Sequence, residues 1–196
     1  MTSVNRFVSK IEIINFVLFV LKFATIEVID NCIKNSLFPI STFLSILTHL
    51  FTLEPTEDVI CGMEELSRMC SFLDDGRVLN TTLTSDKWTV FAPTDEAFEN
   101  AFESIAGLTD DSILDIMKYH TVPGDELKKD DLICETNLIM GNDRASQTTC
   151  STHSGFMYQR GPGNITPRTP RLIAPDNLAC NGVVHIVSQI LLPEEV

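Results

Sequence analysis

The segment Trp88–Phe98, with the sequence WTVFAPTDEAF, constrains the fold of this chain more than any other segment. Its first four residues are aromatic or β-branched, which is typical of a buried strand. Pro93 has no N–H for a sheet ladder and is expected to end the strand. Thr94 is placed to cap a helix, and two acidic residues follow it where the helix dipole favours negative charge. The segment therefore predicts a buried strand that leads directly into a helix.

Helical spacing of apolar residues extends this pattern through the first half of the remaining chain. Helices are predicted at Gly62–Leu73, from Asp95 to about Phe102, and after Thr109, which is placed to cap the third helix. The apolar faces of the second and third helices are expected to contain Ala97, Phe98, Ala101 and Phe102, and Ile113, Ile116, Met117 and His120, respectively.

From Leu132 onward the pattern is that of strands separated by turns. The predicted strands are Leu138–Met140, Ala145–Thr149, Phe156–Gln159, Arg171–Ala174, Val183–Val187 and Gln189–Leu192. Helices that precede a run of strands indicate an α+β fold.

Three motifs, in order, resemble those of the fasciclin domain family. The first is Trp88–Phe98, the second is Tyr119-His120 with the Val-Pro-Gly that follows, and the third is Asn181–Pro193. The resemblance covers roughly Glu57 to Pro193 and implies a compact strand wedge or sandwich with helices packed around it. The matching positions, which the resemblance makes mainly structural, are Thr89, Phe91, Ala92, Pro93, Thr94, Ala97, Phe98, Tyr119, His120, Asn181, Gly182 and His185.

The chain is strongly acidic, with a formal net charge of −13. Four basic and three acidic residues lie in the first 51 positions, so the remainder has a net charge of −14. This charge argues against nucleic acid and against an anionic membrane surface as partners. It permits cationic partners or divalent cations, and the alternative is simply a well-solvated surface.

Residues 1–53 form a hydrophobic leader that precedes the predicted domain, residues 54–196. It has two apolar stretches, Ile11–Ile29 and Leu37–Leu53. The leader is interpreted as a signal peptide with an N-terminal extension, as the product of a start codon assigned too far upstream, or as an uncleaved signal anchor. All three place the domain in a secreted or cell-surface location. The alternative is a pair of helices packed on the domain.

Six cysteines occur, and none lies in a Cys-x-x-Cys pair. Cys134 and Cys150 flank the predicted hairpin, so a disulfide between them is expected. Cys61 and Cys70 are expected to form a disulfide with each other, or one of them is expected to form a disulfide with Cys180. Cys32 lies in the leader and is left over if the leader is removed. The alternative is a cytosolic protein with six reduced thiols.

Two triplets match the N-glycosylation pattern, at Asn80 and at Asn164. Asn80 lies in a polar run ahead of the first strand, which favours an exposed site.

No catalytic constellation is predicted. The chain has no Gly-x-Ser-x-Gly, no glycine-rich phosphate loop before a helix, and no Cys/His cluster with zinc spacing. His120 and His185 lie in apolar contexts, where they either share a metal or acid–base site or are each buried and bonded to backbone; the second interpretation is favoured. The paired acids Asp74-Asp75, Asp110-Asp111 and Asp130-Asp131 lie at turns or helix starts, where capping explains them better than cation binding. No metal and no cofactor are expected.

Two classes of function remain. The resemblance implies an extracellular adhesion or matrix-interaction module whose partner is a cell-surface or matrix protein or a polysaccharide. In that case the contact residues implied by the family are Asp115, Ile116, Tyr119 and His120, although core packing explains Ile116 and His120 better, because they share the apolar stripe of a helix. The alternative is a secreted carrier of a small hydrophobic ligand such as a carotenoid or lipid.

Overall fold

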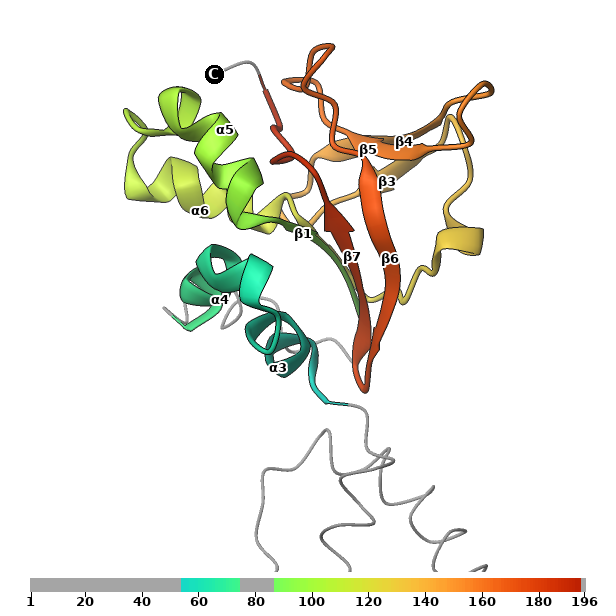
Figure 1. Ribbon diagram of the computed structural model, residues 1–196, viewed down its shortest axis with the longest axis horizontal. Coiled ribbons are helices and arrows are strands. Elements are labelled where there is room, and N and C mark those ends of the chain that lie inside the picture. The colour runs from blue at the N-terminus through green and yellow to red at the C-terminus, as the bar shows by residue number, and fades with distance from the viewer. Residues whose placement is uncertain (1–53, 75–86, 195–196) are drawn as a thin grey trace, which may run out of the picture. The chain divides into compact units, whose positions relative to one another are not determined.

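The computed structural model describes residues 54–74 and 87–194, which form the predicted domain (Figure 1). The leader, Cys32, Asn80 and the turn at Asp75-Gly76 lie outside these residues. The predicted domain boundary lies at the edge of the described range and stays a prediction.

The described chain contains helices followed by strands, which confirms the α+β fold class. The helical elements are α3 (Thr56–Cys61), the 3-10 turn η1 (Glu64–Leu66), α4 (Ser67–Asp74), α5 (Asp95–Ile105), α6 (Asp110–Lys118) and the 3-10 turn η2 (Lys129–Asp131). The strands are β1 (Trp88–Pro93), β2 (Thr121–Pro123), β3 (Asn137–Ile139), β4 (Ala145–Cys150), β5 (Met157–Arg160), β6 (Leu172–Ala179) and β7 (Gly182–Val187).

The strands form two sheets, one of four strands in the order β2-β1-β7-β6 and one of three in the order β3-β4-β5. At the centre of the first sheet, β1 and β7 run parallel, with Trp88 opposite Gly182 and Pro93 opposite Val187. Every residue of both strands is buried. A strand that is buried on both faces has a continuous apolar sequence rather than an alternating one, which explains the run from Trp88 to Pro93.

The core has two parts, one on each face of the first sheet. On one face Trp88, Val90 and Ala92 pack with the helices, together with Val184 and Ile186 from β7. On the other face Phe91 and Val187 pack with residues that lead to the second sheet, including Tyr119, Met140 and Leu191. Figure 1 shows the same arrangement, with α3 to α6 on one side of β1 and β7 and the second sheet on the other.

The two predicted helix caps are confirmed. The Thr94 hydroxyl accepts a hydrogen bond from the Ala97 N–H at the start of α5, and the Thr109 hydroxyl accepts one from the Ser112 N–H at the start of α6. The prediction that Phe102 belongs to the apolar face of α5 is wrong, because its side chain is 61% exposed. Helix α5 buries Ala97, Phe98 and Ala101, and Ile105 packs partly buried against the same core.

The predicted helix Gly62–Leu73 is only partly correct. The backbone is extended at Met63, so the segment consists of η1 and α4, and a separate helix, α3, precedes it. A disulfide between Cys61 and Cys70, with Cα atoms 4.9 Å apart, holds α3 against α4. The contact between the two short helices therefore replaces one longer helix.

Most predicted strands are confirmed within a residue or two, but two differ from the prediction. β6 is longer than Arg171–Ala174, because it continues past irregularities in register between Leu172 and Asn177. Gln189–Leu192 is not a strand; it is an irregular segment that buries Ile190 and Leu191. Its backbone is bonded to side chains from other elements rather than to a neighbouring strand, as described below.

Candidate functional site

His120 lies directly after α6, is fully buried, and is bonded to backbone at both ring nitrogens. Nδ1 lies 2.8 Å from the carbonyl of Ile116, and Nε2 accepts a hydrogen bond of 2.9 Å from the N–H of Leu191. Since a carbonyl only accepts, the neutral tautomer with hydrogen on Nδ1 satisfies both bonds. Burial lowers the pKa of His120 to about 4, against the opposing effect of the Ile116 carbonyl.

His185 on β7 makes an equivalent pair of bonds to different partners. Nε2 lies 2.7 Å from the carbonyl of Leu127, and Nδ1 accepts from the N–H of Asp176 at 3.2 Å. Burial lowers the pKa of His185, while the Leu127 carbonyl and the Asp176 carboxylate oppose the shift. Each histidine bonds to its own set of backbone partners, which agrees with the structural interpretation and not with a shared metal or acid–base site.

The four contact residues implied by the family are mostly inaccessible, and this part of the prediction is wrong. Ile116, Tyr119 and His120 are 5%, 0% and 0% exposed. The Tyr119 hydroxyl donates to the carbonyl of Ala145 at 2.6 Å, and burial raises the pKa of Tyr119 to about 12. Only Asp115 has an accessible side chain, which lies 3.9 Å from Arg144. Ile116 faces the core from α6, and Tyr119 and His120, which follow the helix, are buried where the chain passes to β2.

The remaining motif residues join elements that are far apart in the sequence. The buried Thr89 hydroxyl donates to the carbonyl of Asp125 and accepts from the N–H of Leu127, both at 2.8 Å. The Asn181 side chain accepts from the N–H and the hydroxyl of Thr56, and so holds the start of α3 against the β6–β7 turn.

Gly182 belongs to the same motif and lies against β1. A Cβ atom at this position would collide with the carbonyl oxygen of Trp88. Only glycine therefore lets β7 begin directly beside β1.

Asn164 has a structural role that the sequence analysis missed. It is 2% exposed; its amide nitrogen donates to the carbonyl of Ile190 at 2.8 Å, and its oxygen accepts from the N–H groups of Gly161 and Leu192. The predicted glycosylation of Asn164 is therefore wrong for the folded protein, because the nitrogen that would bear the glycan is buried and bonded. The only signal in the sequence was the pair Gly161 and Gly163 in the Gly-Pro-Gly-Asn turn, because glycine lets another part of the backbone approach closely.

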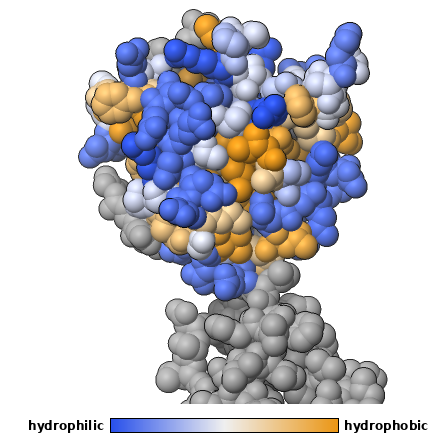
Figure 2. All heavy atoms as spheres, viewed as in Figure 1, coloured by the Kyte–Doolittle hydropathy of each residue, from blue (hydrophilic) through white to orange (hydrophobic). Residues whose placement is uncertain are grey.

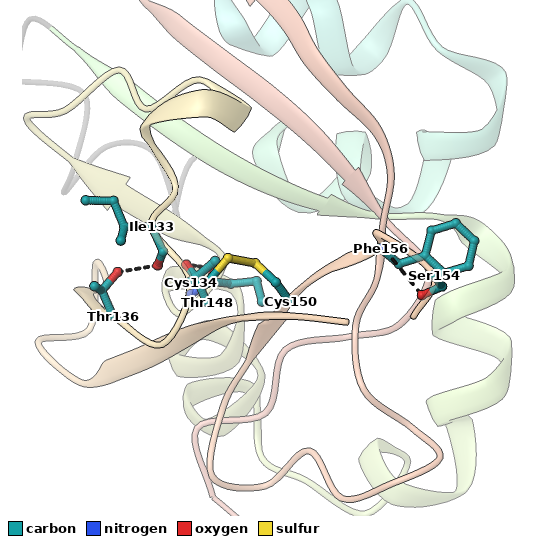
Figure 3. The surroundings of a disulfide bond; sticks show 8 residues. Ile133, Cys134, Thr136, Thr148, Cys150, Ser154 and Phe156 are labelled. Atoms are coloured by element: carbon teal, nitrogen blue, oxygen red, sulfur yellow. Dashed lines mark hydrogen bonds between the residues drawn. A yellow bond between two sulfur atoms is a disulfide. The ribbon is translucent and has the colours of Figure 1, made fainter. Parts of the chain in front are cut away.

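Two disulfides join described residues. Cys134 and Cys150 are bonded, as predicted, with Cα atoms 5.6 Å apart, and Figure 3 shows how they link the segment before β3 to the end of β4. Cys61 pairs with Cys70, which resolves the alternative left open by the sequence. Cys180 is also disulfide-bonded.

Two of the three pairs of acids lie at helix starts, as expected, whereas Asp75 of the third pair lies outside the described residues. Asp110 and Asp111 lie in the first turn of α6. The Asp131 carboxylate accepts from the N–H of Lys128 at the start of η2. Within residues 54–74 and 87–194, no three His, Cys, Asp or Glu side chains are grouped in a way that could hold a metal ion.

An open cleft of about 410 Å³ lies between α5 and β6, and we refer to it as the α5–β6 cleft. One wall comes from η1 and the start of α5, and the other from β6 and the residues that follow β7. The lining residues are Glu65, Thr94, Asp95, Glu96, Asn100, Arg171, Ile173, Ser188 and Gln189. No sequence motif pointed to this cleft, because only the fold brings its four contributing segments together.

Comparison with known proteins identifies relatives. The model of the Fasciclin domain matches residues 64–193. Protein sll1483 of Synechocystis sp. strain PCC 6803 is 23% identical over 141 residues, which are 69% of this chain and 72% of that protein. A solved FAS1 domain pair from the insect cell adhesion molecule Fasciclin I superposes with a TM-score of 0.53 at 19% identity, over 65% of this chain and 45% of that one. The chain thus spans less than half of that domain pair, and the likeness establishes the fold.

Proposed function

Because the chain belongs to the fasciclin domain family, we propose that it is an extracellular or cell-surface adhesion module that binds a partner and performs no catalysis. The observation that supports this most is the family match over residues 64–193. Fasciclin I, which has the same fold, is by its name an insect cell adhesion molecule. The partner class is a cell-surface or matrix protein or a polysaccharide.

The chemistry of the buried polar residues supports a binding role. His120 and His185 are both used in backbone hydrogen bonds, and their lowered pKa values keep them neutral at physiological pH. Neither ring nitrogen of His120 is left to exchange a proton with a substrate. These histidines therefore stabilise the fold that presents a binding surface.

The disulfides support location outside the cytosol. Disulfides such as Cys61–Cys70 and Cys134–Cys150 form and persist mainly in oxidising compartments. Among the described residues, no helix has the length and apolar character needed to cross a bilayer. Anchoring through the leader thus remains a proposal that concerns residues outside the described range.

The experiment that tests this function is retention of the full chain, labelled and expressed in a secreting host, on intact cells and on cell-wall polysaccharide, with and without calcium. Saturable retention supports adhesion. Absence of retention on every surface would contradict it. Protein denatured by reduction and alkylation is the control, because it keeps the composition and charge but loses the fold.

The same retention assay tests Asp115, the accessible one of the four contact residues implied by the family. Asp115→Asn should leave the fold intact, because Asp115 lies at the surface beside Arg144 and Asn142. Retention that survives this change would exclude the Asp115 carboxylate as a contact. The Tyr119→Ala/His120→Ala pair is unsuitable for this purpose, because both side chains lie in the core and the protein is expected to unfold.

Nothing in the described residues favours the carrier of a hydrophobic ligand over adhesion. Eight of the nine residues that line the α5–β6 cleft are polar or charged. A carotenoid or lipid chain would leave these groups without hydrogen bonds, which is unfavourable. We therefore propose adhesion alone.

A further inference from the structure

The α5–β6 cleft lies where the two central parallel strands end. Thr94 follows β1 and Ser188 follows β7, and both line the cleft. At the carboxyl ends of adjacent parallel strands the chain turns away in different directions, which leaves a crevice that open α/β sheets use for binding. The size of the cleft, about 410 Å³, is within the range of about 300–1,000 Å³ that small binding sites occupy.

The β6 wall of the cleft contains one apolar side chain, Ile173, and it is accessible. Ile173 is 43% exposed, and just outside the cleft Phe156 is 45% exposed. The guanidinium of Arg171 lies 4.5 Å from the centre of the Phe156 ring, so the two side chains are held together by a cation–π contact. Figure 2 shows hydrophobic side chains gathered in the middle of the visible face, between the hydrophilic surfaces on either side.

The α5 wall is acidic, and part of its charge is not neutralised. Three carboxylates and one guanidinium line the cleft, which gives it a formal charge of −2. The Asp95 carboxylate accepts from the Ser67 hydroxyl and the Arg68 N–H, whereas the Glu65 and Glu96 carboxylates have no partner in the described part of the chain. With Arg171 held on the Phe156 ring, these two carboxylates face the cleft as free acceptors.

We propose that the α5–β6 cleft docks a basic peptide segment of a partner protein, with Lys or Arg side chains on Glu65 and Glu96 and an apolar side chain on Ile173. This rests on the proposed adhesive function and names the class of partner. A basic segment complements both the cleft and the net charge of −13 of the whole chain, which draws cationic groups toward it. A neutral saccharide would leave this charge complementarity unused.

The contact should be modest in strength and sensitive to salt. Each exposed ion pair contributes about 1 kcal/mol or less, and salt screens it over a distance of about 8–10 Å. A single cleft of this kind therefore suits repeated, reversible contacts between surfaces, where several copies act together.

The test uses the full chain from a secreting host and a fluorescein-labelled peptide of alternating lysine and leucine, with binding followed by fluorescence anisotropy. The Glu65→Gln/Glu96→Gln variant should bind the peptide about three- to tenfold more weakly. The matched control is Glu103→Gln/Asp130→Asn, which removes the same charge from exposed positions outside the cleft and should stay within about twofold of the unmodified chain. Ile173→Ser should also weaken binding.

Three results would overturn the proposal. One is equal weakening in the cleft variant and the charge-matched control, which would indicate attraction to the whole acidic surface. Another is absence of peptide binding. The third is displacement of the peptide by a neutral cello-oligosaccharide while a lysine-leucine competitor has no effect, which would make the cleft a saccharide site.

Cell retention separates this inference from the proposed function. If the unmodified chain is retained on cells and the cleft variant is retained equally well, adhesion stands and the cleft is not its contact. If the unmodified chain is not retained but binds the peptide through Glu65 and Glu96, the cleft site stands and the adhesive function fails.

Discussion

His120 joins the end of α6 to the irregular segment Gln189–Leu192. Its ring bonds the Ile116 carbonyl on one side and the Leu191 N–H on the other, so loss of either bond would leave a buried backbone group unsatisfied. Asn164 works in the same way at the Ile190 carbonyl and the Leu192 N–H. These two side chains replace the strand partner that Ile190–Leu192 does not have.

The pKa of His120 makes stability depend on pH. It is about 4 in the folded protein against an ordinary value of 6.5, so the unfolded chain binds the proton more readily between these values. We expect the free energy of unfolding to be highest above pH 6.5, and to fall by up to about 3 kcal/mol between pH 6.5 and 4. Urea denaturation across this range measures it.

The control for this prediction is a pair of variants. His120→Gln should be less stable at pH 7 and should show a shallower pH dependence, with His185 responsible for part of what remains. Exposed His153→Gln should keep the original dependence. An unchanged slope in His120→Gln would contradict the role assigned to this residue.

Asn164 and Thr166 provide a second prediction at this scale. Asn164→Ala should lower the free energy of unfolding by about 2–4 kcal/mol, because three buried backbone groups lose their partner. Thr166→Ala destroys the same glycosylation triplet but changes only an exposed side chain, so its effect should be below about 0.5 kcal/mol. Intact mass and chemical denaturation measure both, and a glycan lost in Thr166→Ala would show that Asn164 is accessible after all.

At the scale of elements, the second sheet is short and depends on a covalent link. Strand β3 has three residues and forms one edge of the sheet; its last residue, Ile139, is 60% exposed, and Ile133 before it is 66% exposed. Few apolar contacts therefore hold this strand in place. The Cys134–Cys150 disulfide closes the hairpin and keeps β3 in register with β4.

We expect Cys134→Ser/Cys150→Ser to lower the free energy of unfolding by about 3 kcal/mol, as the chain-entropy model gives for a loop of this size. Thermal and urea denaturation of the purified variant measure the loss. Reduction of the unmodified chain is a weaker test, because it also opens Cys61–Cys70. A variant with unchanged stability would show that packing alone holds the hairpin.

At the scale of the whole molecule, the helices and the second sheet enclose the four-stranded sheet on its two faces. This leaves the ends of β1 and β7 as the place where a cleft opens. Three carboxylates line this cleft and the chain has a formal net charge of −13, which favours basic partners. The proposed adhesion through such a surface would have an electrostatic component.

Retention on cells should therefore fall as salt rises. Between about 50 mM and 500 mM sodium chloride the screening length shortens to a few ångström, so a basic partner should be attracted less strongly. Retention measured across this range, with sucrose added at equal osmolarity as control, checks the expectation. Retention that does not change with salt would indicate an apolar contact instead.

Local signals in the sequence were sufficient for much of the fold. The strand and helix of Trp88–Phe98, the caps at Thr94 and Thr109, and the Cys134–Cys150 hairpin were all predicted correctly, since each depends on residues close together in the chain. Periodicity alone was less exact: at Gly62–Leu73 it marked a helix but not the break at Met63, and at Gln189–Leu192 it marked buried residues but not the type of element.

What the sequence by itself determined is the family, the order of elements and the acidic character of this protein. The tertiary structure alone decided which polar residues are enclosed. His120 meets Leu191 across 71 positions of sequence, and Asn164 meets Ile190 across 26. The same holds for the α5–β6 cleft, which exists only where the ends of β1 and β7 lie side by side. Such contacts depend on how distant elements pack, and no local pattern of residues encodes them.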